Sequence, residues 1–247
     1  PGSLNHNRRS FTAENVDPER SSLNVVYRDE PIQKVYHELF DDAVGRYNAK
    51  QKRKDRCISD YYEHLRTGKQ EKVFHELIVQ IGNKDDMGVL TENGALAKKL
   101  LDEYMQGFQE RNPTLRVFGA FLHMDEATPH LHIDFVPYVS SWKGKGLDTK
   151  VSLKQALKAL GFAGGSKRES ELNQWINAEK EQLARVMERH GIEWEQKGTH
   201  EEHLSVLDFK KRERSKEVAA LEAVKQECQT DLTEMQEQLE TVQTAVD

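Results

Sequence analysis

Three histidines within ten residues constrain this chain more than any other feature of its sequence. The segment GAFLHMDEATPHLHIDFVPY, residues 119–138, contains His123, Asp125, Glu126, His130 and His132. Apolar residues on both sides of this polar centre predict two strands joined by a short acidic turn. Residues two apart in a strand point to the same face. His130 and His132 therefore share one face, and the turn brings His123 back toward them.

Converging imidazoles beside a carboxylate are typical of a divalent-metal site. Three protein ligands leave coordination positions open for substrate oxygen atoms, whereas structural zinc sites usually have four ligands and often use cysteine. Both cysteines, Cys57 and Cys228, are remote from the histidines in the sequence. The pattern therefore predicts a metal centre held by His123, His130 and His132, with a non-catalytic structural zinc site as the alternative.

Length and composition are typical of a water-soluble protein with a substantial core. The chain has 247 residues, of which 32% are charged and 36% hydrophobic. No apolar run approaches the roughly 18 residues of a membrane span, and no signal-peptide pattern opens the chain. Two distant cysteines argue against a disulfide framework. We expect a cytoplasmic protein without a membrane span.

Periodicity predicts both strands and helices. Strands are expected over residues 23–27 and 73–81, besides the two that flank the acidic turn. Helical spacing begins at Pro31 and predicts a helix that continues toward Tyr62. Further helices are predicted over residues 94–110, 152–160 and 170–190.

The C-terminal segment has a different pattern. Spacings of three and four alternate along a seam formed by Val218, Leu221, Lys225, Cys228, Leu232, Met235, Leu239, Val242 and Val246. Residues 216–247 hold eight acidic and two basic residues, which accounts for the whole net charge of −6. We predict two domains, residues 1–215 and a coiled-coil helix over residues 216–247 that pairs two copies of the chain. A single helix packed on the first domain is the alternative.

Local basic clusters matter for binding a polyanion even where the net charge is negative. The clusters are the segment Lys50–Arg56, the glycine-containing loop 141–150 with Lys143 and Lys145, and the segment Lys210–Arg214. They are candidate contacts for such a ligand, and solvated helix faces are the alternative.

Three motifs together resemble one protein family. The pattern His-x-Asp-Glu-x-Thr-Pro-His-x-His, residues 123–132, is similar to that of the Mob/Pre plasmid mobilisation relaxases, a group of HUH endonucleases. Residues 6–9 resemble the family's first motif, His-Asn-x-Arg, and residues 17–24 resemble its second, which ends in Ser-x-Leu-Asn. The resemblance extends over about residues 4–215. Relatives usually have a strand before the first motif, whereas only five residues precede His6.

The resemblance implies an α+β fold, with a central antiparallel sheet of the HUH relaxase type flanked by helices and a C-terminal coiled-coil helix. It implies a relaxase that nicks one strand of origin-of-transfer DNA by metal-dependent transesterification and stays attached to the 5′ end. The first-motif histidine is the nucleophile in this family, which implies a phosphohistidine at His6. Mn²⁺ is the expected ion, with Mg²⁺ or another divalent cation as alternatives. Expected partners are single-stranded or supercoiled origin DNA, a second copy of the chain and the conjugative coupling machinery, in the bacterial cytoplasm.

The same resemblance suggests roles for neighbouring residues. Glu126 either ligates the metal or sets the tautomer of His6, and we favour the second role because an attacking nitrogen must be unprotonated. Asp125 is expected to support a ligand histidine from outside the metal site. Contacts to DNA phosphates are expected from Asn7, Arg8, Asn24, Lys143 and Lys145.

Two other functions remain as alternatives. A rolling-circle replication initiator or a transposase-like HUH nickase would use a tyrosine nucleophile. Relatives often have a tyrosine directly after the second motif, where this chain has Val25, so the remaining candidates are Tyr27, Tyr61 and Tyr62. A DNA-binding module with a degenerate active site is the other alternative, and the intact set of histidines argues against it.

Overall fold

The computed structural model describes residues 4–68, 70–166, 169–193 and 206–246. Its helices are α1 (Leu4–Asn7), α2 (Ile32–Ala49), α3 (Tyr61–Thr67), α4 (Glu92–Gln106), α5 (Phe108–Arg111), α6 (Leu153–Ala159), α7 (Glu171–Arg189) and α8 (Val206–Val246). Its strands are β1 (Val25–Asp29), β2 (His75–Gln80), β3 (Leu115–His123), β4 (His130–Val139) and β5 (Lys150–Val151). The 3-10 helices η1 and η2 cover Pro18–Leu23 and Lys54–Arg56. Helices around one antiparallel sheet confirm the predicted α+β class.

The two strands of the histidine hairpin form the centre of the sheet. The strand order is β1-β3-β4-β2, all neighbours are antiparallel, and β5 pairs with the far end of β4. The register of β3 and β4 places His123 opposite His130. β1 and β2 are the outer strands of this order, so they flank the hairpin on both sides.

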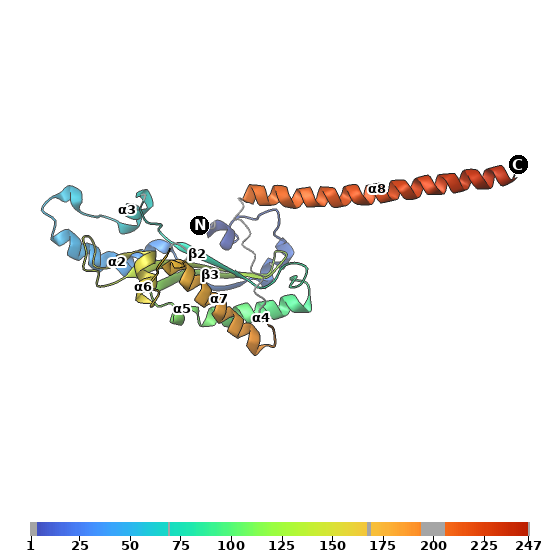
Figure 1. Ribbon diagram of the computed structural model, residues 1–247. Helices are drawn as coiled ribbons and strands as arrows, with labels where there is room; N and C mark the ends of the chain where they lie inside the picture. The colour runs from blue at the N-terminus through green and yellow to red at the C-terminus, as the bar shows by residue number, and fades with distance from the viewer. Residues whose placement is uncertain (1–3, 69, 167–168, 194–205, 247) are drawn as a thin grey trace. The chain divides into compact units, whose positions relative to one another are not determined.

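One face of the sheet is covered by helices and carries the main core. Leu131, Ile133 and Phe135 of β4 lie in this core with side chains of α4, α6 and α7. Figure 1 shows these helices gathered along one side of the strands. Each fully buried large apolar side chain contributes about 1.5–3 kcal/mol, so this packing fixes the orientation of β4. Because strand residues alternate, His130 and His132 must face the opposite side.

A β-bulge in β3 decides which face His123 occupies. Val117 lies in the helix-covered core, and the pairing of β3 with β4 shifts between Val117 and Gly119. Without this shift, His123 would share the face of Val117, because the two are an even number of residues apart. The bulge reverses the alternation, so Leu122 joins the helix-covered core and His123 faces the other side. A Cβ at Gly119 would lie only 3.0 Å from the Phe121 ring, so glycine suits this position.

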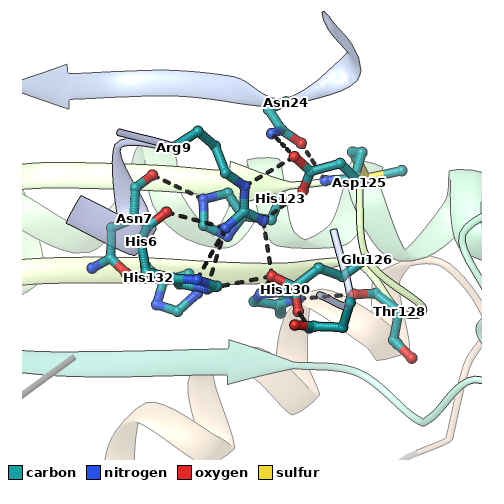
Figure 2. A network of polar contacts seen from close by, with 12 residues as sticks. His6, Asn7, Arg9, Asn24, His123, Asp125, Glu126, Thr128, His130 and His132 are labelled. Carbon is teal, nitrogen blue, oxygen red and sulfur yellow. Dashed lines mark hydrogen bonds and ion pairs between the residues drawn. The ribbon is translucent and has the colours of Figure 1, made fainter. Parts of the chain in front are cut away.

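On the other face of the sheet, two longer helices of the first unit cover one end. There α2 and α3 pack on Phe118 and Val136 in a second apolar cluster. At the end where His123 and His130 lie, the short helix α1 and polar side chains stand over the strands (Figure 2). This end of the sheet therefore carries the polar side chains from which a functional site can be built.

One helix prediction is wrong. The helix that was predicted to run from Pro31 toward Tyr62 ends at Ala49. The Asn48 side chain donates to the Ile58 carbonyl and accepts from the Ile58 N–H. These two hydrogen bonds tie the chain into a loop after α2, and a separate short helix, α3, follows it.

The chain divides into two compact units, residues 1–194 and residues 195–247. The second unit contains α8, one helix of 41 residues that begins before the predicted domain boundary at residue 216. Four of its seam side chains are exposed, by 52% at Val218, 69% at Leu221, 58% at Leu232 and 67% at Met235. Pairing of this helix with a second copy stays a prediction. Among the described helices, none is both long enough and apolar enough to cross a membrane.

Candidate active site

The acidic turn and the central strands bring the three predicted ligand histidines together. β3 ends at His123 and β4 begins at His130, its direct cross-strand partner. The ring centroids are 5.2 Å apart for His123 and His130, 4.7 Å for His123 and His132, and 4.9 Å for His130 and His132. The three imidazoles thus converge on the face of the sheet that α4, α6 and α7 leave uncovered.

A fourth imidazole joins them from the N-terminal segment. His6 of α1 lies 5.6 Å from the His123 ring and 5.7 Å from the His132 ring, centroid to centroid. One ring nitrogen from each of the four histidines lies within 4.8 Å of the others. Figure 2 shows the rings close together above the central strands. The fold therefore places the first motif directly on the histidine hairpin.

Each hairpin histidine has one ring nitrogen fixed by an oxygen atom. The pairs are His123 Nε2 with the Asn7 carbonyl at 2.9 Å, His130 Nδ1 with the Thr128 carbonyl at 2.9 Å, and His132 Nδ1 with Glu76 Oε1 at 2.7 Å. A neutral imidazole that donates from one nitrogen has a free lone pair on the other. The second nitrogens of His123 and His132 are buried and have no hydrogen-bond partner among the described residues.

Those two unpartnered nitrogens fit a bound metal ion. Burial lowers the pKa of His123 to about 3 and also lowers the pKa of His130, so both rings are neutral at pH 7. The second nitrogen of His130 lies 3.7 Å from a Glu126 oxygen. His123, His130 and His132 are the residues that can hold the ion, and His6 is close enough to reach it.

Asn7 fixes α1 to the sheet. Its side chain donates to Glu76 at 3.0 Å and to Asp134 at 2.9 Å, and its carbonyl accepts from His123. Burial raises the pKa of Asp134 to about 6. Because Asn7 is only 1% exposed, it faces the sheet rather than a DNA phosphate, contrary to the prediction. It positions His6, its neighbour in the chain.

Two neighbours of opposite charge act on His6. Glu126 Oε1 lies 3.3 Å from His6 Nε2, and Arg9 Nη1 lies 3.4 and 3.2 Å from the two ring nitrogens. Burial and the Arg9 cation lower the pKa of His6, and they outweigh Glu126, which raises it. Arg9 Nη2 approaches Glu126 more closely, at 2.8 Å, so the guanidinium balances that carboxylate. His6 is therefore neutral at pH 7.

Arg9 is the site residue that reasoning from the sequence missed. Its φ of 54° lies in the left-handed region and turns the chain after α1 toward the hairpin. Its guanidinium binds both Asp125 oxygens, at 2.9 and 2.5 Å. The signal was in the motif His-Asn-x-Arg, whose arginine corresponds to Arg9, whereas Arg8 occupies the variable position.

Arg8 points away from the four histidines. Its side chain donates to Asp29 at 2.7 Å and to the Glu30 carbonyl at 3.3 Å, at the end of β1. The predicted phosphate contact of Arg8 is therefore not supported by its position. The arginine that stands beside the nucleophile candidate is Arg9.

Asp125 joins the three motifs. Its carboxylate is fully buried and accepts from Arg9 of the first motif, and from Ser21 at 2.9 Å and Asn24 at 2.7 Å of the second. Burial alone raises the pKa of Asp125, but the hydrogen bonds from Arg9, Asn24 and Ser21 outweigh burial and hold the pKa well below its usual range. Asp125 thus anchors the N-terminal motifs rather than a ligand histidine. Asn24 also accepts from the Met124 N–H, so it faces the hairpin and not a DNA phosphate.

The predicted lysine contacts lie far from the histidines. Lys143 and Lys145 are exposed in the loop between β4 and β5. At a rise of 3.3 Å per strand residue, about 25 Å separate His132 from the start of this loop. Arg46, near the end of α2, pairs with Asp148 of the same loop, so the basic segment 50–56 begins at this end too. Any DNA contact made here is remote from the chemistry.

The tyrosines that were alternative nucleophiles have other partners. Tyr27 donates to Asp102 of α4 at 2.8 Å, on the helix-covered face. The Tyr61 hydroxyl accepts from the Val151 N–H, and the Tyr62 ring packs edge-to-face on Tyr36. Within the described ranges, no tyrosine contacts the four histidines.

Comparison with known proteins identifies a family that matches most of the chain. Residues 27–211 match the Mob_Pre family, described as plasmid recombination enzyme. A plasmid recombination enzyme of Streptococcus agalactiae is 24% identical over 217 residues, which cover 85% of this chain. This chain spans about a third of the length of that relative, 36%.

Solved structures that resemble this chain include the relaxase domain of MobM. One of them is a manganese-bound crystal structure of this domain with a 22-nucleotide oriT DNA of plasmid pMV158, at pH 5.5. It is 24% identical to this chain, the match covers 84% of this chain and 90% of that chain, and the TM-score is 0.47. The form at pH 4.6 is 22% identical, covers the same shares and has a TM-score of 0.49.

The family match includes the whole histidine hairpin and extends over well more than half of the chain. It confirms the resemblance that the motifs indicated. The chain therefore belongs to the Mob_Pre family, the plasmid recombination enzymes.

Proposed function

We propose that this chain is a plasmid mobilisation relaxase that nicks one strand of origin-of-transfer DNA and keeps the 5′ end on His6. The observation that carries this proposal is the convergence of His6 with three buried histidines, with four ring nitrogens within 4.8 Å of one another. Family membership supplies the plasmid context, and the site supplies the chemistry.

His123, His130 and His132 are the proposed ligands of a divalent metal ion. Three outer oxygens, from Thr128, Glu76 and Asn7, hold these rings in orientation, as is usual for metal-binding histidines. When bound, the ion polarises the scissile phosphate and neutralises its charge. We propose Mn²⁺, with Mg²⁺ as the alternative; phosphate oxygens suit both ions, and the three imidazoles disfavour Mg²⁺, which prefers oxygen ligands.

His6 is the proposed nucleophile. A lone pair on one ring nitrogen forms the bond to phosphorus while the bond to the 3′ oxygen breaks. The ring loses the proton of its other nitrogen, for which Glu126 is the nearest carboxylate, at 3.3 Å from Nε2. The departing oxygen gains a proton and becomes a 3′-hydroxyl. The phosphohistidine that remains preserves the energy of the bond for rejoining the strand.

Arg9 and Glu126 are proposed to prepare His6. Arg9 keeps the ring neutral through its positive charge, and Glu126 selects which nitrogen carries the proton. Both residues are also bound to each other, so neither charge is left unpaired near the substrate. A neutral nucleophile is thereby available at pH 7, with Glu126 placed to accept its remaining proton during the attack.

The wider assembly is also a proposal. The exposed seam of α8 supports pairing of two copies of the chain. We propose that the substrate is single-stranded or is opened from supercoiled origin DNA, and that the conjugative coupling machinery of the bacterial cytoplasm receives the covalent complex.

A nicking assay tests this function. Single-stranded oligonucleotides that tile the plasmid's origin region are incubated with the protein and Mn²⁺, and the products are separated under denaturing conditions. We expect one cleavage position, loss of cleavage in His6→Ala, and normal cleavage in Tyr27→Phe. Cleavage by His6→Ala at the normal rate would overturn the proposal.

A further inference from the structure

Exposed apolar side chains gather around the histidine cluster. In the described residues before α8, large apolar side chains with high exposure are Phe11 (61%), Leu23 (49%), Val26 (61%), Ile78 (55%), Leu90 (84%) and Leu172 (41%). Val26 and Ile78 belong to β1 and β2, the strands that pair with the hairpin. Phe11, Leu23 and Leu90 each lie within two residues of a residue that hydrogen-bonds to the acidic turn. Exposed apolar groups on segments that border a candidate site are candidates for contact with its ligand.

Two of these side chains flank the cluster in one cross-strand row. Val26 is opposite Phe121, Phe121 is opposite His132, and His132 is opposite Ile78. Cross-strand partners stand on the same face of a sheet, so this row lies on the uncovered face with the histidines. At about 4.8 Å between neighbouring strands, Val26 and Ile78 are about 14 Å apart with the cluster between them.

The core does not need an apolar residue at either position. The chain neighbours Val25 and Tyr27, and likewise Leu77 and Val79, point to the helix-covered face and belong to its core. The positions between them face water, where strand alternation favours polar residues. On outer strands, exposed apolar side chains also invite wrong pairing. Their presence beside the active site therefore calls for a ligand.

We propose that Val26 and Ile78 form an apolar shelf for the bases of the two nucleotides that flank the scissile phosphate. The inference rests on the proposed nicking function, because it places a phosphate at the histidine cluster. A phosphate held there carries one nucleoside toward β1 and the other toward β2. Bases that are released from a stack gain from contact with apolar side chains.

The shelf selects single-stranded DNA rather than a base sequence. Val26 and Ile78 have no hydrogen-bonding groups in their side chains, so they can pack against the faces of bases but cannot read the donors and acceptors on base edges. In a duplex those faces are covered by stacking on neighbouring pairs. Contact with base faces tolerates any sequence, so recognition of the origin must come from other residues.

The test compares two DNA probes of equal charge. One is oligo-dT of about 20 nucleotides and the other is an abasic chain of the same length. Affinities are measured by fluorescence anisotropy with Mn²⁺ at fixed salt. Because phosphate contacts are the same for both probes, the ratio of the two affinities isolates the contribution of the bases.

The variants are Val26→Thr and Ile78→Thr, which keep a β-branched side chain and therefore suit a strand. We expect the full chain to bind oligo-dT about tenfold tighter than the abasic chain. Each substitution should lower this ratio about threefold, and the double variant should bring it close to one. Leu172→Gln is the matched control, an exposed apolar residue on α7 away from the cluster, and it should leave the ratio unchanged.

An unchanged ratio in the double variant overturns the shelf. If the double variant leaves the ratio unchanged but has a different molecular mass from the native chain in sedimentation, the surface is a contact between copies of the chain, and the shelf is also overturned. Nicking of origin DNA by the native chain is measured separately. If the double variant lowers the ratio but the native chain does not nick, the apolar contact with bases is supported and the proposed function is removed. If the native chain nicks but the double variant leaves the ratio unchanged, the proposed function is supported and the shelf is removed.

Discussion

Arg9 is the cation nearest to His6, and the protonation of His6 depends on it. Burial lowers the pKa of His6 most, followed by the charge of Arg9, and His132 adds a smaller lowering. Glu126 and Glu76 raise the pKa, but they do not reverse this effect. A lowered pKa extends the neutral form to lower pH. Nicking that requires neutral His6 therefore rises as the pH increases through this lowered pKa.

Replacing Arg9 should move that rise. Without the guanidinium, the pKa of His6 increases toward its usual value of about 6.5, so Arg9→Gln should nick more slowly than the native protein near pH 6. The measurement is a pH profile of single-turnover nicking. Arg8→Gln is the matched control, since Arg8 pairs with Asp29 outside the cluster. A profile that moves equally in both variants contradicts the role of Arg9.

Asp125 should be important for stability as well as for the site. Asp125→Asn leaves the largely buried Arg9 guanidinium without its main partner, and breaking a buried ion pair costs about 3 kcal/mol. Denaturant unfolding at pH 7 measures this loss. The pKa of Asp125 is depressed in the folded state, so its contribution is present above the unfolded pKa of about 4 and is lost as the pH falls.

The control for Asp125 is another bidentate arginine–aspartate pair. Asp55 binds Arg53 in the same way, but both side chains are well exposed. Asp55→Asn should leave the unfolding midpoint unchanged, because exposed pairs contribute little. Equal losses in the two variants would show that burial of the Asp125 pair is unimportant.

Glu76 should determine how tightly the metal is held. It fixes the His132 ring through Nδ1, and loss of such an outer partner typically weakens metal binding about 10- to 100-fold. Titration calorimetry of Glu76→Gln with Mn²⁺ measures the change without relying on nicking. Glu63→Gln, an exposed residue on α3 paired with Arg66, should bind the metal as the native protein does. An unchanged affinity in Glu76→Gln rejects this role.

At the scale of elements, the strands were predictable and the bulge was not. Alternation over residues 73–81 and the apolar runs around the acidic turn are local signals, and β2, β3 and β4 lie where these signals indicated. The bulge before Gly119 depends on the register between β3 and β4, which no local pattern determines. The same bulge puts His123 on the face of the site.

The site was predictable where its residues are close in sequence. His130 and His132 are two residues apart in one strand, so their shared face follows from strand geometry, whereas the face of His123 also depends on the bulge. The partners of Asp125 come from segments about a hundred residues earlier, and only the folded chain brings them together. The end of α2 was missed for a related reason, because it depends on hydrogen bonds between a side chain and a later loop.

Helix α8 leads to a prediction about pairing. Cys228 occupies a seam position and is exposed, so in a parallel coiled coil it would face the same residue of a second copy. Mild oxidation should therefore produce a disulfide-linked dimer on non-reducing gels. Cys57→Ser should keep this product and Cys228→Ser should lose it. Cross-linking that needs Cys57 instead contradicts the proposed pairing.

Across the first unit, the chemistry and the basic loop lie at opposite ends of β4. Lys143 and Lys145 should therefore contribute to DNA affinity without affecting the nicking step. Replacing both with alanine should lower the salt slope of origin-DNA binding by up to about 2. Single-turnover nicking at saturating DNA should keep its rate. A lower rate under those conditions would place the loop near the scissile phosphate.

The covalent link between DNA and protein tests the central claim for the whole molecule. The native chain is incubated with Mn²⁺ and intact single-stranded origin DNA, the adduct is digested with protease and nuclease, and the modified peptide is identified by mass spectrometry. The structure predicts a nucleotide joined through phosphorus to His6, with the acid lability of a phosphoramidate. An acid-stable nucleotide on Tyr27, Tyr61 or Tyr62, with His6 unmodified, would contradict the account.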